Sequence, residues 1–256
     1  MTESHAVAAS AVDLRKSYGR GQSAVDALAG VTVSFPQGQF AAVMGPSGSG
    51  KSTLMQCLAG LDSVTSGQVW IDGTEITRLR DRALTRIRRD RVGFVFQAYN
   101  LVPTLTARQN MLLPLSLARR PVDAEWFDEV VQTLGLTERL RHRPHELSGG
   151  QQQRVAVARA LMSRPAVIFA DEPTGNLDSA SGAEVLRLLR TSVTELGQTV
   201  IMVTHDPIAA SHSDRVVLLA DGHLAGEIFH PSVDSVLAAL RGVQAPAAQT
   251  ASAQTL

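Results

Sequence analysis

The residues at 45–52 have the types and spacing needed to bind a phosphate chain. They read Gly45-Pro46-Ser47-Gly48-Ser49-Gly50-Lys51-Ser52 and match the pattern G-x-x-x-x-G-K-[ST] at every fixed position. The glycines let successive backbone N–H groups point at an anion, and the start of the following helix adds a partial positive charge. Lys51 can then reach the β- and γ-phosphates, while Ser52 can ligate Mg²⁺. The sequence therefore predicts a site for a nucleoside triphosphate.

Two carboxylates follow an apolar run that predicts a buried strand. Residues 166–170 are continuously apolar, as in strands covered on both faces of a parallel sheet, and Asp171 and Glu172 come directly after them. We predict that Asp171 binds the Mg²⁺ already held by Ser52 and the phosphates. Glu172 points differently, so we predict that it orients or deprotonates the attacking water.

Gln97 and His205 stand at the ends of two further predicted strands, residues 92–96 and 199–203. In an open α/β sheet, ligands bind beyond the carboxyl ends of the strands. Gln97 is therefore a candidate to reach the metal or the water, and His205 a candidate to contact the γ-phosphate. A lone histidine is more often a packed or surface residue, so the argument for both rests on their placement.

A second anion-binding helix start is predicted at residues 148–151, within the sequence LSGGQQQR. Ser148 has the chemistry of an N-cap, and Gly149 and Gly150 leave backbone N–H groups open. One nucleotide is already cradled at 45–52, so a second site makes sense if two copies of the chain close each other's nucleotides. The alternative is a Gly-Gly hinge before a helix, and spacing does not separate the two.

The elements around these residues predict an α/β fold with a mostly parallel sheet. A short apolar strand is expected at 40–44, directly before the phosphate loop. Helices are expected at 52–59, 106–117, 123–134, from about 148, and 179–196. Other strands are expected at 11–18 (an edge strand), 31–35, 68–71 followed by the Asp72-Gly73 turn, and 215–228 as a closing hairpin.

Composition narrows the class of protein further. The chain has 256 residues, 44% of them hydrophobic, and a formal net charge of zero, so no global attraction to nucleic acid is indicated. One cysteine, Cys57, suits a reducing cytoplasm and is expected to be a small core residue. Neither a signal peptide nor an apolar run of membrane-spanning length is evident.

Residues 78–91 contain seven arginines against two aspartates. A patch that binds RNA or a membrane is one interpretation. We favour a solvated helix beside a partner surface, because the aromatic residues that would stack on bases are absent.

Four features together resemble one protein family. The sequences GPSGSGKS at 45–52, LSGGQQQR at 147–154 and VIFADEPTGNLD at 167–178, with Gln97 and His205, resemble the nucleotide-binding subunit of an ATP-binding-cassette (ABC) transporter. The resemblance covers roughly residues 12–226. It implies a phosphate-loop NTPase core, an N-terminal antiparallel β subdomain and a helical subdomain at about 98–163. On this basis residues 1–242 are one ATPase domain, and 243–256 are predicted to be a disordered tail.

The resemblance also implies roles for individual residues. Tyr18 resembles the aromatic residue that stacks on adenine, and Gln97 the lid glutamine between the nucleotide and the helical subdomain. His205 resembles the switch histidine, and Asp178 the residue of the loop at the dimer seam. Phosphates and Mg²⁺ would be held by Lys51, Ser52 and Thr53. The γ-phosphate in the opposite subunit would be contacted by Ser148, Gly149, Gly150 and Gln151. Stacking tolerates either purine, so the choice of ATP over GTP depends on the family.

Within the family, residues 96–110 and 170–182 are most similar to the macrolide-export and lipoprotein-release branch. This implies a homodimeric ATPase that drives a separate membrane permease, which would hold it at the inner face of the cell membrane. One alternative is a permease-coupled regulator of cell-wall hydrolysis or division with no transported substrate. Another is an ABC ATPase of translation or DNA repair, but such proteins usually carry two cassettes or a long coiled-coil insertion. No nucleic-acid partner is expected.

Overall fold

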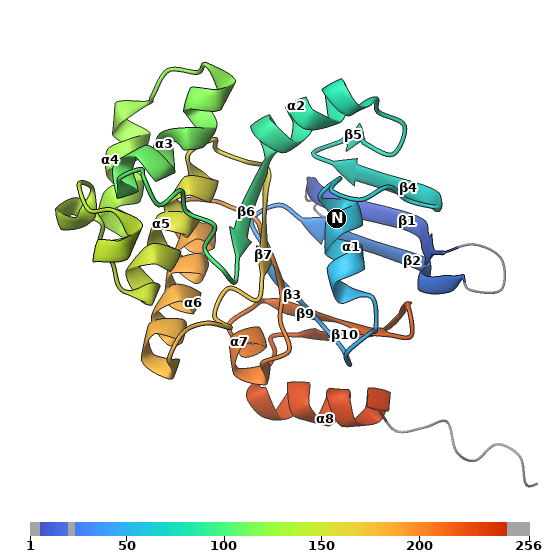
Figure 1. Ribbon diagram of the computed structural model, residues 1–256. Coiled ribbons are helices and arrows are strands. Elements are labelled where there is room, and N and C mark those ends of the chain that lie inside the picture. The colour runs from blue at the N-terminus through green and yellow to red at the C-terminus, as the bar shows by residue number, and fades with distance from the viewer. Residues whose placement is uncertain (1–5, 20–23, 245–256) are drawn as a thin grey trace, which may run out of the picture.

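A six-stranded sheet in the order β10-β9-β3-β8-β7-β6 lies at the centre of the molecule (Figure 1). Its strands are β3 (Phe40–Met44), β6 (Val92–Phe96), β7 (Val167–Asp171), β8 (Val200–Val203), β9 (Arg215–Ala220) and β10 (His223–Phe229). All neighbours are parallel except β9 and β10, which form the predicted closing hairpin. The computed structural model describes residues 6–19 and 24–244.

The two faces of this sheet pack against different helices. Phe40, Ala42 and Met44 of β3 belong to a core shared with α5 (Gly149–Leu161) and α6 (Ser179–Thr194). Ala41 and Val43 belong to a second core shared with α1 (Lys51–Leu58). Because side chains alternate along a strand, α1 and α5 lie on opposite faces of the sheet.

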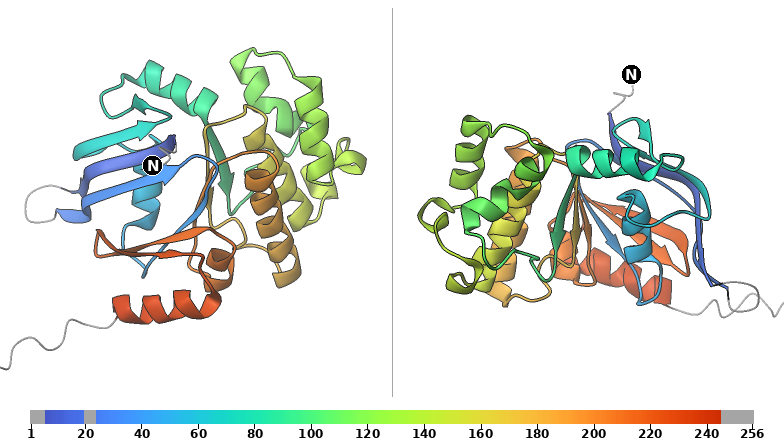
Figure 2. Two further views of the ribbon diagram at one scale, coloured as in Figure 1. Left: turned by 180° about the vertical axis from the view of Figure 1, so that it is seen from behind. Right: turned by 45° about the horizontal axis from the view of Figure 1, so that its top comes forward.

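An antiparallel sheet in the order β2-β1-β4-β5 covers the α1 side (Figure 2). It contains β1 (Val7–Tyr18), β2 (Val25–Pro36), β4 (Ser66–Ile71) and β5 (Thr74–Glu75). The predicted hairpin turns at Asp72 and Gly73, both with positive φ. The prediction that residues 11–18 form an edge strand is wrong, since β1 pairs with both β2 and β4.

The helical segment lies on the opposite side of the central sheet from the antiparallel sheet (Figures 1 and 2). It contains α3 (Ala107–Ala118), α4 (Ala124–Thr133) and α5, with 3₁₀ turns at Thr137–Arg139 and Pro144–Glu146. Thr106, Asp123 and Ser148 cap the three helices through their side-chain oxygens, as their residue types favour. Trp126 is buried and donates to the Leu161 carbonyl at 3.1 Å, so it belongs to the local core.

Three helices complete the chain. The arginine-rich segment forms α2 (Asp81–Arg91), while α7 (Pro207–Ser211) and α8 (Val233–Gln244) were not predicted from the sequence. The tail expected from residue 243 therefore begins inside α8, and residues 245–256 lie outside the described part, as do residues 20–23. In the described ranges, each helix is too short or too polar to cross a membrane.

Candidate nucleotide site

The phosphate loop joins β3 to α1 and is supported by backbone from distant elements. A Cβ atom on Gly45 would lie 2.1 Å from the Leu219 carbonyl oxygen, and one on Gly50 would lie 2.3 Å from the Ala27 carbonyl oxygen. The amide of Gly222 also donates to the carbonyl of Ser49 at 3.2 Å. The loop is thus held against β2 and the β9–β10 hairpin.

The inner side of this loop is open and rich in donors. Gly50 is the N-cap of α1 and supplies no side-chain acceptor for the first amides of the helix. A Cβ on Gly48 would meet nothing within 4 Å, and the buried Ser49 hydroxyl has no hydrogen-bond partner among the described residues. Free amides, an unpaired hydroxyl and open space fit a phosphate chain.

Lys51 folds back over the loop. Its Nζ donates to the carbonyls of Gly45 at 2.9 Å and Pro46 at 2.8 Å. Burial lowers the pKa of Lys51, and the negative charge of Glu172 opposes that shift. The ammonium therefore lies on the loop carbonyls and within range of the charge of Glu172.

Asp171 is the last residue of β7, and Glu172 follows it directly. Burial raises the pKa of Asp171, and the charge of Glu172 raises it further. A desolvated carboxylate at the same sheet edge as the Ser52 hydroxyl is the donor chemistry that Mg²⁺ prefers. Across residues 6–19 and 24–244, no cluster of three or more acidic, His or Cys side chains forms a ready-made metal cage.

Glu172 is fixed by residues at the end of β8. Its backbone is left-handed, with φ of 45°, and its Oε1 lies 2.7 Å from Nδ1 of His205. The Thr204 hydroxyl lies 3.3 Å from the other carboxylate oxygen. The structure thus brings Glu172 and His205 together at the sheet edge, and it adds Thr204, which the sequence analysis missed.

Gln97 faces a different partner from the one predicted. Its Nε2 donates to the Asn176 Oδ1 at 2.9 Å, and the Asn176 Nδ2 donates to the Gln97 carbonyl at 3.1 Å. A Cβ on Gly175 would lie 2.8 Å from Gln97 Nε2, so the glutamine packs on this loop. Its predicted role at the metal stays a prediction. Asn176 was missed because an amide pair between distant loops leaves no spacing signal.

Tyr18 lies beside the start of α1 and is 43% exposed. Its hydroxyl donates to Asp62 Oδ2 at 2.8 Å. Burial and this bond raise the pKa of Tyr18, while the nearby Thr53 side chain lowers it in part. Thr53 is in the first turn of α1, so Tyr18 lies near the phosphate loop, where stacking on a base was predicted.

The second helix start is capped within its own chain. Ser148 accepts from the Gln151 amide at 3.3 Å, and the Gln151 side chain accepts from the Ser148 amide at 3.0 Å. Asp178 similarly caps α6 by accepting from the amides of Ala180 and Ser181, each at 3.0 Å. Because α5 and α1 pack on opposite faces of the sheet, the structure does not bring the Ser148 segment to the same chain's Lys51.

Comparison with known proteins decides the family. Residues 28–175 match the family described as "ABC transporter". The chain belongs to the ABC transporter family. Its fold also matches a dimeric structure of the ATP-binding cassette MJ0796 bound to ADP and Pi, with a TM-score of 0.76 and 41% identity. That match covers 88% of this chain and 99% of the cassette.

Two relatives indicate where in the family the chain lies. It is 49% identical to the macrolide export ATP-binding/permease protein MacB of Marinobacter nauticus, over 83% of this chain and 33% of MacB. It is 44% identical to the bacitracin export ATP-binding protein BceA of Halalkalibacterium halodurans, over 84% of this chain and 85% of BceA. The chain thus spans about a third of the length of the MacB relative and most of BceA.

Proposed function

We propose that this chain is the ATP-hydrolysing subunit of an ABC transporter, which pairs with a second copy on binding ATP and drives a separate membrane permease. The observation that carries the proposal is the convergence at one sheet edge of the open phosphate loop, Lys51 and the Glu172–His205 pair. Family membership and the dimeric structure of a similar cassette with ADP and Pi support it.

Different residues of the site bind the phosphates, bind the metal ion and activate the water. Loop amides and Lys51 hold the phosphate chain, which requires the ammonium to leave the carbonyls of Gly45 and Pro46. Ser52 and Asp171 would hold Mg²⁺, which would supply positive charge at the phosphate oxygens. Glu172 orients the attacking water and accepts its proton, while His205 and Thr204 fix the carboxylate.

A second copy of the chain completes each site. The start of α5, with Ser148 to Gln151, adds amides and a helix dipole that the nucleotide's own chain provides only at 45–52. Asp178 lies at the start of α6, which packs beside α5 on the same face of the sheet. Both segments would then meet the partner's phosphates in a head-to-tail pair.

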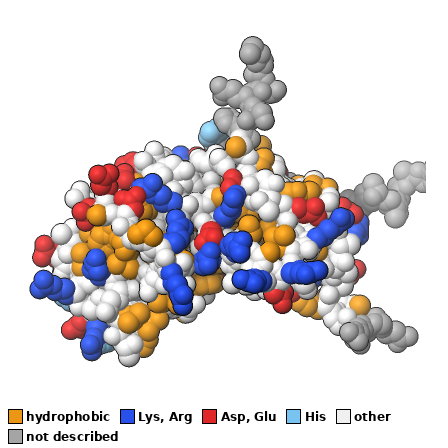
Figure 3. Space-filling view, turned by 90° about the horizontal axis from the view of Figure 1, so that it is seen from above, with side chains coloured by type: hydrophobic (Ala, Val, Ile, Leu, Met, Phe, Trp, Pro, Cys, Tyr) orange, Lys and Arg blue, Asp and Glu red, His pale blue; other side chains and the backbone are white. Residues whose placement is uncertain are grey.

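The permease would dock in an apolar groove between α2, β6 and α3. The groove has a volume of about 710 Å³, and its lining includes Phe94, Phe96, Leu113, Pro114 and Leu117. Leu117 is 73% exposed. Figure 3 shows Lys and Arg side chains gathered beside hydrophobic patches on the face that carries these helices. Docking there would hold the chain at the inner face of the cell membrane.

Replacement of Glu172 with glutamine tests the enzymatic proposal. The variant keeps the hydrogen-bonding shape but lacks the base, so ATP binding should persist while phosphate release stops. Light scattering should then detect an ATP-dependent dimer. Lys51→Ala is the control and should lose ATP affinity, because the phosphate charge loses its partner. Turnover at the wild-type rate in Glu172→Gln would remove Glu172 from the proposed role.

Replacement of Leu117 tests the docking proposal. Leu117→Glu places a charge at the mouth of the groove, so co-purification with the membrane fraction should fall when a candidate permease is co-expressed. Leu224→Glu is the matched control, since Leu224 is also exposed but lies on β10, away from the groove. Equal membrane recovery of both variants would place the docking surface elsewhere.

A further inference from the structure

Lys16 is a buried cation outside the residues assigned to phosphate binding or hydrolysis. Its side chain is only 9% exposed, and its Nζ donates to Asp62 Oδ1 at 2.7 Å and to the Ser63 carbonyl at 2.6 Å. A buried ammonium is costly unless it is paired and hydrogen-bonded. Lys16 meets that condition, and its two hydrogen bonds fix the position of the ammonium group.

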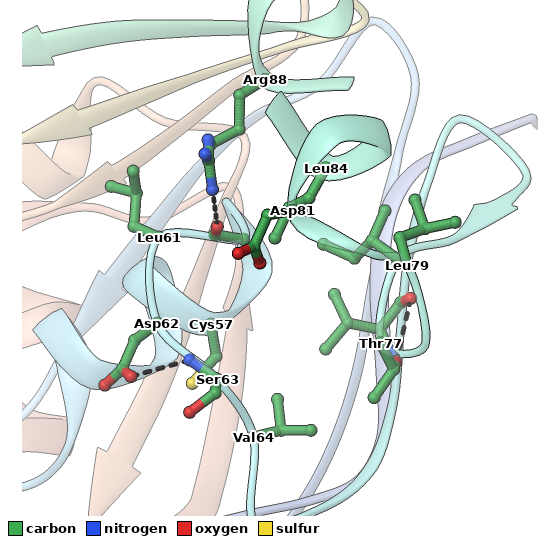
Figure 4. A pocket seen from close by; sticks show the side chains of 13 residues that line it. Cys57, Leu61, Asp62, Ser63, Val64, Thr77, Leu79, Asp81, Leu84 and Arg88 are labelled. Carbon is green, nitrogen blue, oxygen red and sulfur yellow. Dashed lines mark hydrogen bonds between the residues drawn. The ribbon is translucent and has the colours of Figure 1, made fainter. Parts of the chain in front are cut away.

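Asp62 is the centre of this cluster. Besides Lys16, it accepts from the Tyr18 hydroxyl at 2.8 Å and from the Ser63 amide at 2.7 Å. Burial acts to raise the pKa of Asp62, but the bonds from Lys16 and Tyr18 lower it on balance, so the carboxylate stays ionised. Figure 4 shows Asp62 just after α1, with its bond to Ser63 drawn and Cys57 beside it.

The ring of Tyr18 is held from two directions. Its hydroxyl is tied to Asp62, and Nζ of Lys16 lies 4.8 Å from the ring centroid, within the range of a cation–π contact. The residue nevertheless keeps 43% of its surface exposed, beside Thr53 at the start of α1. A tethered ring with free surface beside a phosphate site is pre-arranged to stack on a base.

We propose that Lys16 and Asp62 are positioning residues that hold the Tyr18 ring in the orientation that stacks on the nucleotide base. The inference rests on the proposed function, since it assumes a nucleotide at residues 45–52. A ring that must be ordered during binding lowers affinity by about two- to tenfold. The cluster removes that cost before the nucleotide arrives.

The test compares a ligand with a base and a ligand without one. Calorimetry gives the affinity of each variant for a non-hydrolysable ATP analogue and for inorganic tripolyphosphate. Asp62→Asn and Tyr18→Phe should each lower analogue affinity about two- to tenfold, and Tyr18→Ala about five- to hundredfold. Tripolyphosphate affinity should not change in any of the three, because the phosphate contacts are intact.

Matched controls separate positioning from a general loss of structure. Asp13→Asn is the first, since Asp13 also lies on β1 and pairs with an arginine, Arg15, but is exposed and does not contact Tyr18. Its analogue affinity should equal that of the wild type. The Tyr18→Phe and Asp62→Asn effects should also be non-additive in the double variant, since both remove the same hydrogen bond.

Two results would overturn the proposal. One is unchanged analogue affinity in both Asp62→Asn and Tyr18→Phe. The other is an equal loss of tripolyphosphate affinity, which would mean that the cluster acts on the phosphate loop. Lys51→Ala distinguishes failure of the proposed function. It should lower the affinity for both ligands. If it lowers neither affinity, residues 45–52 are not the nucleotide site, whatever the Asp62 variants show.

Discussion

Gly45 and Gly50 leave no room for a side chain, because backbone carbonyls of other elements pass behind the phosphate loop. The Leu219 and Ala27 oxygens would lie 2.1 and 2.3 Å from Cβ atoms at these positions. Real Cβ atoms do not approach an oxygen so closely. The sequence pattern predicts the turn of the loop, whereas the steric need for glycine comes from β2 and β9, which the pattern does not contain.

An alanine scan of the loop glycines should show this difference. Gly45→Ala should destabilise the fold by about 3 kcal/mol or more, because backbone must shift. Gly48→Ala should cost only about 1 kcal/mol, since its Cβ enters open space and only the positive φ is unfavourable. Urea unfolding measures both. Equal losses would mean that the backbone behind Gly45 gives way freely.

The Cys57 thiol gives a pH-dependent prediction. Burial, with a smaller contribution from Asp62, raises the pKa of Cys57 to about 11. An unfolded thiol titrates near about 8.5. Between these values the unfolded chain binds fewer protons than the folded chain, so stability falls as pH rises. Below about pH 8 the full contribution of the neutral thiol is present.

Cys57→Ala isolates this contribution. The variant should lose stability at pH 7.5 because it leaves a small cavity, but its further loss between about pH 8.5 and 10.5 should be smaller than in the wild type. Urea unfolding at about pH 8.5 and 10.5 gives the loss of stability of each protein. The contributions of other titrating groups cancel in the comparison, because both proteins contain them. Parallel pH profiles would contradict the prediction.

At the scale of elements, the segment after β6 is held in an unusual conformation. Tyr99 and Asn100 both have positive φ, at 59° and 52°. Arg159 of α5 donates to their carbonyls, at 2.9 Å to Tyr99 and 2.5 Å to Asn100. A Cβ on Gly149 would lie 2.9 Å from the Tyr99 hydroxyl. The last turn of α5 thus holds this segment through Arg159, and the first turn contacts it at Gly149.

Removing the Arg159 hydrogen bonds should loosen the segment. Arg159→Met deletes two charge-assisted hydrogen bonds, so amide hydrogen exchange over residues 97–103 should accelerate by about tenfold or more. Arg164→Met is the control, because Arg164 forms an exposed ion pair with Asp123 on the helical side. An unchanged exchange rate in Arg159→Met would show that other contacts hold residues 97–103 in place.

Features that depend on residues close together in the sequence were predictable. Features that depend on pairing between distant segments were less predictable. The phosphate loop, the buried strands and the caps at Thr106, Asp123 and Ser148 follow from local chemistry. The interior position of β1 in its sheet could not be predicted in this way. Left-handed Asp13 (φ 44°) and several register shifts expose polar residues along β1, so its sequence pattern is that of an edge strand. The partners of Glu172, Gln97 and Tyr18 come from segments 33, 79 and 44 residues away, which no spacing rule connects.

At the scale of the whole molecule, the central sheet separates the two helix starts that we propose to bind phosphate. Core residues of α1 and α5 pack on opposite faces of β3. A head-to-tail pair of chains would bring the start of α5 in one copy to the phosphate loop of the other. Each site then depends on Lys51 from one chain and Ser148 from its partner.

Mixing two inactive variants tests that arrangement. Lys51→Ala and Ser148→Arg should each abolish ATP hydrolysis alone, through lost phosphate binding and through a blocked helix start. A mixed dimer contains one site with an intact Lys51 and an intact Ser148, so phosphate release should reappear on mixing. The double variant mixed with wild type is the control and should leave no intact site in the mixed dimer. No recovery in the first mixture would contradict the head-to-tail pair.

The backing of the phosphate loop has a consequence for synthesis of the chain. Residues 45–52 leave the ribosome early, yet Leu219 and Gly222, which support Gly45 and Ser49 from behind, are made more than 160 residues later. A nascent chain arrested before β9 would carry the whole glycine-lysine pattern without the backbone that holds it in shape. Nucleotide capture should therefore begin only when the last hairpin has been added, and it would report that translation of the domain is nearly complete.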